Sequence, residues 1–198
     1  CSYGYTCAYT DTISWGSPSE PMPMLRNPRL AFEALFAVVL SARYFISYDY
    51  GFSKAAIHGV FHSISAWNNA GFALYTDSFI GFSNDWFFSI AVCLAVVLGG
   101  IGFPVLRTFA IHKLKWRMWP MHSKLMVSAT AALLVLGTIL FLLFEWSNPR
   151  TLGALPETAR LHSAFFHSVQ TRTAGFNSVD VAALNEESLL VSTILMFI

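Results

Sequence analysis

Three long apolar stretches constrain the fold of this chain more than any other feature of its sequence. Residues 86–106 carry no charged side chain, residues 125–145 carry one at their very end, and residues 30–47 carry only Glu33 and Arg43. Each stretch has roughly the 17 to 25 residues that an α-helix needs to cross a bilayer. We therefore expect three membrane-spanning helices.

The composition supports an integral membrane protein. Hydrophobic residues make up 55% of the chain and charged residues 12%, against about 25% charged residues in an average soluble domain. The net charge of +1 gives no reason to expect a nucleic-acid partner. Cys1, Cys7 and Cys93 have neither metal-binding nor disulfide spacing.

A short motif occurs twice between the apolar stretches. Phe-His-Ser stands at residues 61–63 and 166–168, and Ala-Gly-Phe at 70–72 and 174–176. The first pair is separated by 105 residues and the second by 104, so the two copies align with a one-residue slip. A motif repeated at such a distance indicates two copies of one structural unit.

Each copy has the pattern of a re-entrant loop. Residues 55–67 and 159–170 are mixed-apolar segments too short to span a bilayer. Each is followed by a glycine, Gly71 or Gly175, which permits left-handed backbone angles and close approach. Non-helical backbone at membrane depth is tolerated where it lines a water-filled cavity, and its carbonyl groups can select ions.

These elements divide the chain into four parts. Residues 1–29 read as a loop-like segment of unclear role, and residues 30–111 as a membrane-helix, pore-loop, membrane-helix unit. Residues 112–123 are a basic cytoplasmic loop. Residues 124–198 are a second such unit, and we interpret its last helix as truncated because its apolar run is about half the length of a span.

The charges predict an orientation. Between residues 107 and 124 all five charged side chains are basic: Arg107, Lys113, Lys115, Arg117 and Lys124. Basic residues gather on the cytoplasmic side, so we expect this segment in the cytosol and both pore loops entering the cell membrane from outside. Acidic residues would then collect at the outer mouth and attract cations, or simply make the loops polar: Asp49, Asp77, Asp85, Glu145, Glu157, Asp180, Glu186 and Glu187.

Three motifs together resemble one family. Residues 65–72 (SAWNNAGF) and 171–178 (TRTAGFNS) resemble the second and third pore loops of the Trk/Ktr/HKT superfamily of cation transporters, most closely those of the Ktr membrane subunit. Residues 99–105 (GGIGFPV) resemble the end of the inner helix of that subunit's second repeat. The resemblance covers about residues 30–198.

The resemblance implies an all-α integral membrane protein with four such repeats around a pseudo-fourfold pore, of which this chain contains two. Each repeat would contribute one filter glycine, here Gly71 and Gly175. The implied potassium-binding filter consists of the backbone carbonyls of Asn68, Asn69, Ala70, Gly71, Arg172, Thr173, Ala174 and Gly175. A glycine in all four repeats goes with potassium selectivity in this family, and a serine in the first repeat with sodium.

The same resemblance implies no cofactor, potassium as the transported ion and sodium as a possible coupling ion. The expected partners are the lipid bilayer, a second copy of the full-length subunit in a homodimer, and a cytosolic nucleotide-binding regulatory ring. A sodium or mixed cation transporter and a half-transporter that serves only in assembly are the alternatives. An aquaporin-type channel is disfavoured, because its inverted repeats have three spans each and an Asn-Pro-Ala element.

Two further features of the sequence bear on function. His58 and His62 are four residues apart on the first short segment, a spacing that could bind a metal. We favour packing and hydrogen bonding for them, and no pattern of catalytic carboxylates or of a nucleophile with its base indicates an enzyme. Arg172 would repel cations if it faced the pore, so we predict that it points behind the filter and pairs with a carboxylate or with backbone carbonyls.

Overall fold

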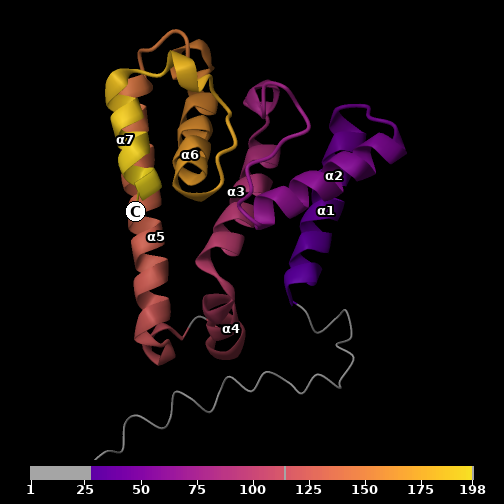
Figure 1. Cartoon of the computed structure of the whole chain (residues 1–198), viewed down its shortest axis with the longest axis vertical. Helices are drawn as coiled ribbons and strands as arrows, with labels where there is room; N and C mark the ends of the chain where they lie inside the picture. The colour runs from indigo at the N-terminus through magenta and orange to yellow at the C-terminus, as the bar shows by residue number, and fades with distance from the viewer. Residues whose placement is uncertain (1–27, 114, 198) are drawn as a thin grey trace, which may run out of the picture. The chain divides into compact units, whose positions relative to one another are not determined.

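The computed structural model describes residues 28–113 and 115–197, and all regular secondary structure within them is helical (Figure 1). Of the unit Cys1–Ala31, only residues 28–31 are described, as the first turn of α1; the rest of the predicted segment 1–29 lies outside the described residues. The remaining described residues belong to the compact unit Phe32–Ile198.

The described helices fall into two similar series. The first consists of a long helix, a short helix, a 3-10 turn and a third helix: α1 (Pro28–Ser47), α2 (Phe52–Trp67), η2 (Ile80–Phe82) and α3 (Trp86–Ile101). A connection follows, made of α4 (Phe103–His112) and η3 (Trp116–Met118). The second series is α5 (Met121–Glu145), η4 (Leu152–Ala154), α6 (Glu157–Thr173), η5 (Val181–Ala183) and α7 (Glu186–Phe197).

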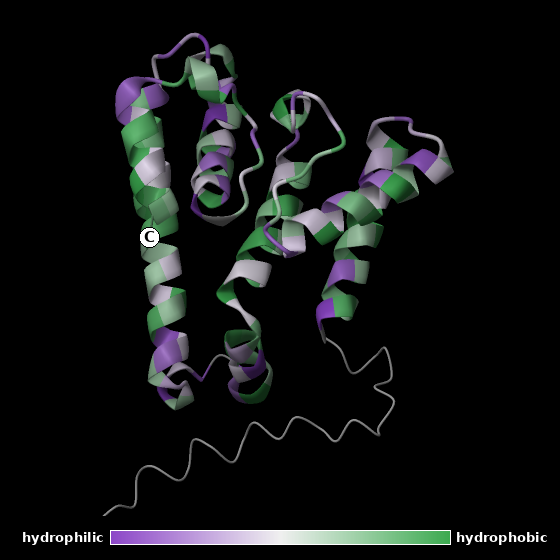
Figure 2. Ribbon diagram, in the orientation of Figure 1, coloured by the Kyte–Doolittle hydropathy of each residue, from purple (hydrophilic) through white to green (hydrophobic). Residues whose placement is uncertain are grey.

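Helices α1 and α5 are each long and apolar enough to cross a membrane, and α3 with α4 qualifies as a third span if the bent pair is counted as one. Figure 2 shows that most of the length of α5 is coloured as hydrophobic, and many large apolar side chains of these helices are exposed. Val38, Ile46, Val135 and Leu143 are all more than half exposed. An aqueous surface seldom carries so many exposed apolar residues, whereas lipid accommodates them.

The span predicted over residues 86–106 contains a sharp bend near its end. The chain bends by 97° between α3 and α4. Gly102 forms the bend with φ +89° and ψ 157°, a backbone conformation that is almost exclusive to glycine. Pro104 then stands in the first turn of α4, where its missing N–H is tolerated.

The two series pack directly against each other through α3 and α6. Within each series the short helix lies against its neighbours, α2 on α3 and α6 on α5 and α7. The core between them is rich in aromatic rings, five of which are at most 1% exposed: Tyr44, Phe79, Phe88, Phe166 and Phe176. This core fixes the positions of the two short helices.

Gly99 shows how closely α3 approaches α2. An ideal Cβ at Gly99 would lie 2.9 Å from the carbonyl carbon of Trp67, the last residue of α2, and closer still to its oxygen. Only a residue without a side chain permits this contact. Gly99 therefore serves close helix packing, whereas Gly102 forms the bend.

Candidate ion-filter site

Two glycine-containing segments from the two series meet in the structure. Glycine loop 1 comprises residues 68–72, and glycine loop 2 comprises residues 172–176. An ideal Cβ on Gly71 would lie 3.1 Å from the carbonyl carbon of Ala174 and 3.5 Å from that of Gly175. Gly71 and Gly175 both have left-handed backbones, with φ +71° and +84°. The fold thus brings the two predicted filter glycines side by side.

Both loops begin at the carboxyl end of a short helix. Helix α2 ends at Trp67, four residues before Gly71, and α6 ends at Thr173, two residues before Gly175. The last carbonyl groups of a helix have no partner within it. They also carry the negative end of the helix dipole, equivalent to roughly half an electron charge. Two partially negative helix ends therefore converge where the glycine loops touch.

The one-residue slip between the repeats has a local explanation. In loop 1 the helix-ending hydrogen bond runs from the Ala70 N–H to the Ser65 oxygen at 2.9 Å, and in loop 2 from the Gly175 N–H to the Gln170 oxygen at 2.8 Å. Loop 1 thus has one more residue before its glycine. Asn69 accommodates it with a left-handed backbone, φ +51°, which asparagine tolerates better than most residues.

Side chains of α2 hold loop 1 from behind. The Ser65 hydroxyl donates to the Phe72 carbonyl at 2.8 Å and accepts from the Phe72 N–H at 3.0 Å. Nε2 of His62 accepts from the Leu74 N–H at 3.2 Å, and Nδ1 lies 3.1 Å from the Tyr44 hydroxyl. Because Nε2 accepts, the proton of a neutral ring is on Nδ1. His62 is therefore engaged in positioning the loop.

The histidines do not form a metal cluster. His58 bonds through Nδ1 to the hydroxyl of Tyr75 at 2.9 Å, so each of the two i, i+4 histidines has its own tyrosine partner. Across the described ranges 28–113 and 115–197, no group of three or more metal-ligating side chains comes together. The geometry agrees with a packing and hydrogen-bonding role.

The two asparagines of loop 1 point their amides away from Gly71. With the amide oriented to suit its neighbours, Asn69 donates to the Val96 carbonyl at 3.1 Å and accepts from the Gly100 N–H at 3.3 Å. Asn68 donates to the Ile64 carbonyl at 2.8 Å and to Glu33 Oε1 at 3.2 Å. Glu33, which lies in a predicted span, thus contacts the loop, a role that the sequence did not reveal.

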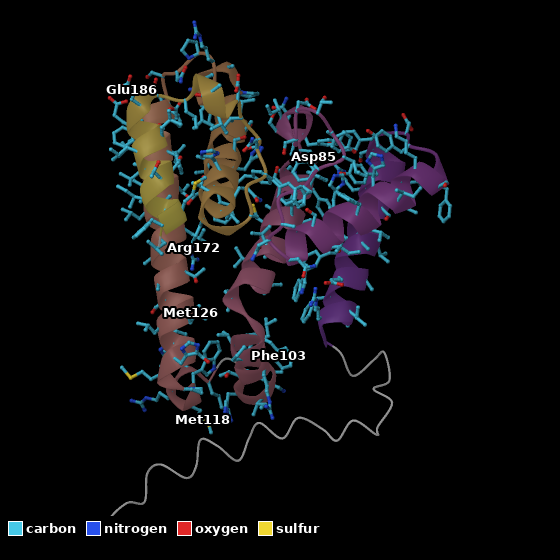
Figure 3. All side chains as sticks on the ribbon, in the orientation of Figure 1. Asp85, Phe103, Met118, Met126, Arg172 and Glu186 are labelled. Atoms are coloured by element: carbon cyan, nitrogen blue, oxygen red, sulfur yellow. The ribbon has the colours of Figure 1, made fainter. Side chains whose placement is uncertain are left out.

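Arg172 occupies the last turn of α6, roughly midway between the two ends of the helices in Figure 3. Its side chain is half-buried in a crevice between α3, α5 and α6, together with Val96, Gly100 and Thr130. The predicted partner is not found: no described carboxylate or carbonyl lies within hydrogen-bond distance of the guanidinium. A cation in the last turn of a helix is nevertheless stabilised by the helix dipole.

Loop 2 lacks the side-chain support of loop 1. His167 corresponds to His62, and Gln170 to Ser65. Both are almost fully buried, but within the described residues neither side chain makes a hydrogen bond. The His167 ring packs edge-on against Phe141, with 4.4 Å between ring centres. Equivalent positions in the two repeats therefore have different functions.

Asp85 joins α1 to the start of α3. Its carboxylate caps α3 by accepting from the Phe88 N–H at 3.2 Å, and Arg43 donates to both oxygens at 2.8 and 2.9 Å. Tyr48 adds a hydrogen bond at 3.0 Å. Burial acts to raise the pKa of Asp85, but these hydrogen bonds and the Arg43 charge outweigh it and lower that pKa below its ordinary value.

Glu145 has the corresponding place in the second series. This fully buried carboxylate accepts from the Asn185 N–H at 2.8 Å and from the Ser188 hydroxyl at 2.5 Å, both at the start of α7. Asn148 donates at 2.7 Å, and Thr151 donates as well. The carboxylate thus ties the end of α5 to the amino end of α7.

These two contacts correct the expectation that all eight acidic residues line an outer mouth. Asp85 and Glu145 are buried, because the exposed N–H groups at the start of α3 and α7 require acceptors. The other six are exposed: Asp49, Asp77, Glu157, Asp180, Glu186 and Glu187. In Figure 3, Asp85 and Glu186 lie at the end of the helices opposite Met118, which belongs to the basic segment.

Comparison with known proteins identifies the family of this chain. Residues 29–198 match the TrkH family, described as cation transport proteins. The chain belongs to this family. Among similar proteins, the Ktr system potassium uptake protein B of Vibrio alginolyticus is 40% identical over 176 residues, and that of Bacillus subtilis is 35% identical over 169; each alignment covers 85% of this chain and 37% of the relative.

A third relative broadens the comparison. The potassium/sodium uptake protein NtpJ of Enterococcus hirae is 36% identical over 151 residues, which cover 76% of this chain and 33% of the relative. The chain thus spans little more than a third of the length of these relatives. Family membership confirms the resemblance to the Trk/Ktr/HKT superfamily that the three sequence motifs indicated.

Proposed function

We propose that this chain supplies two of the repeats that line a potassium-translocating pore. The backbone carbonyls of residues 68–71 and 172–175 replace part of the hydration shell of the ion. The observation that carries the proposal is the meeting of Gly71 with Ala174 and Gly175, at the carboxyl ends of two short helices. Both helix ends are partially negative, which favours a cation.

The side chains around this junction support coordination by backbone rather than by carboxylates. The amides of Asn68 and Asn69 bond to groups behind the loop. Arg172 lines a crevice between α3, α5 and α6, and the proposal requires its charge to stay there, off the path of the ion. A site built from carbonyl dipoles binds a weakly hydrated monovalent cation without the strong retention that a carboxylate ring would cause.

The wider assembly is part of the proposal. Two further repeats, a homodimer and a cytosolic nucleotide-binding ring complete the transporter, with sodium as coupling ion and no organic cofactor. The basic segment 107–124 faces the cytosol, where it docks the ring or binds anionic lipid headgroups. The names of the relatives support potassium: two are potassium uptake proteins and one a potassium/sodium uptake protein.

The test is potassium-limited growth of a bacterium without its own uptake systems that expresses the full coding sequence containing this chain. Gly71→Ser and Gly175→Ser are compared with the parent at equal protein level. The expected result is rescue by the parent and weaker or sodium-shifted uptake in both variants. Equal rescue by the parent and both variants would show that the two glycines are ordinary turn residues without a role in ion selection. A well-expressed parent that does not rescue in the presence of its regulator would point to an assembly subunit.

A further inference from the structure

The segments that follow the two glycine loops are hydrogen-bonded to each other. The Phe79 N–H donates to the Asn177 carbonyl oxygen at 2.9 Å. The Asn177 N–H donates to the Ser78 hydroxyl oxygen at 3.1 Å. Both backbone groups of Asn177 are thus bound by two consecutive residues of the other repeat, of which Ser78 lies 99 positions earlier in the sequence.

Two aromatic rings reinforce this connection. Phe79 stacks on Phe176 with 4.7 Å between ring centres and an angle of 26° between the ring planes. Both rings are 1% exposed, and Phe176 directly follows Gly175. We call Ser78, Phe79, Phe176 and Asn177 the inter-loop bracket. It joins the two repeats within two residues of the second filter glycine.

Ser78 adopts a conformation that its own residue type does not favour. Its φ of +56° lies in the left-handed region, which is uncommon for residues other than glycine, asparagine and aspartate. Such strain persists where the surrounding structure fixes it, and it often accompanies a functional constraint. Here the strained residue places its hydroxyl against the N–H of Asn177.

The bracket is well placed to compensate for the missing supports of loop 2. In loop 1 the side chains of Ser65 and His62 hold the backbone beyond Gly71. The corresponding side chains of loop 2 make no hydrogen bond within the described residues. The backbone beyond Gly175 is instead held by Ser78 and Phe79. The backbone beyond Gly175 is therefore held by the other repeat rather than by side chains of its own helix.

We propose that Ser78 is a positioning residue that determines ion specificity, because the bracket fixes the separation between the two filter loops. The inference rests on the proposed transport function and goes beyond it. The separation of carbonyl groups on opposing loops sets which ion they can surround in place of water. A loosened bracket lets loop 2 adapt to a smaller ion, so discrimination between potassium and sodium declines.

The experiment measures initial uptake of potassium and of sodium by the full-length transporter, with its regulator, in cells without other uptake systems. Ser78→Ala removes the hydroxyl and keeps the strain, whereas Ser78→Gly removes both. Ser83→Ala is the matched control from the same segment, because the Ser83 hydroxyl makes no hydrogen bond to a described residue. Ser78→Asn keeps an acceptor oxygen on a residue that tolerates the left-handed backbone.

Both Ser78→Ala and Ser78→Gly are expected to lower the ratio of potassium to sodium uptake about threefold or more, as loss of one hydrogen bond predicts. Ser83→Ala keeps the parental ratio, and Ser78→Asn restores most of it. The ratio does not depend on how many molecules fold. For a variant with little uptake, the same discrimination is read from purified protein, as the potassium and sodium concentrations that raise its melting temperature.

An unchanged ratio in Ser78→Ala and Ser78→Gly, with uptake of both ions following protein level, would overturn the specificity role and leave the bracket a folding contact. A parent that transports no potassium would refute the proposed function itself. The two failures are thus distinguished by whether the parent is active.

Discussion

Gly99→Ala tests whether the close approach of α3 to α2 holds glycine loop 1 in place. The added Cβ would lie 2.9 Å from the carbonyl carbon of Trp67, whereas carbon atoms pack at about 3.5 to 4.0 Å. The carbonyl oxygen of Trp67 would be closer still, so the helices must separate by more than about 0.6 Å. If α2 and its loop move away from α3, the bonds from Asn69 to Val96 and Gly100 lengthen from 3.1 and 3.3 Å to about 3.7 and 3.9 Å, beyond hydrogen-bond range.

The cost is that of overpacking a dense interior, about 1 to 3 kcal/mol, with the strain concentrated at the entry to loop 1. Since 1.4 kcal/mol corresponds to a factor of ten, potassium uptake at limiting concentration should fall about tenfold at equal protein level. Gly51→Ala is the control, because its Cβ would have no described atom within 4 Å. Uptake by Gly99→Ala equal to that of Gly51→Ala would refute the reasoning.

Three further predictions concern the glycines and the buried acids. Gly71→Ala should reduce uptake more than Gly175→Ala: both have positive φ, which costs about 1 to 2 kcal/mol, but only the Gly71 side chain would collide with the neighbouring loop. Asp85→Asn should lower the melting temperature of the detergent-solubilised protein at pH 7. The pKa of Asp85 is lower in the folded protein than its ordinary value of 3.8, so the stabilising charge is present above pH 3.8 and is lost as the pH falls through the folded pKa. The difference in melting temperature between variant and parent should therefore shrink below pH 3.8. A difference in melting temperature that stays constant with pH would contradict this. Glu145→Gln places an NH₂ group among four donors and should cost about 3 kcal/mol, measured by the same melts, whereas the exposed Glu157→Gln should cost almost nothing.

Much of the helical arrangement could be predicted from the sequence, because membrane helices leave a strong signal. The apolar runs predicted α1 and α5 to within a few residues. The repeated motif predicted α2 and α6, since two copies of a short apolar segment ending in glycine are hard to produce by chance. It also identified Gly71 and Gly175, whose left-handed backbones the structure shows.

The rest depends on interactions that apolar patterning does not encode. The sequence predicts one span over residues 86–106, because hydropathy depends on residue type alone and does not report a change of chain direction at Gly102. The Arg43–Asp85 pair joins residues 42 positions apart, and no local spacing indicates it. Glu145 looked like an ordinary acid at the end of a span, and only the folded position of α7 shows why it is buried.

The unequal length of the two glycine loops has a consequence for how the two series of helices can change in evolution. In a channel built from four identical subunits, each mutation alters all four quadrants together. Here the extra residue is accommodated by Asn69 alone, and its amide binds α3 of its own repeat. The two similar series can therefore diverge independently of each other, while the glycine that each contributes remains in place.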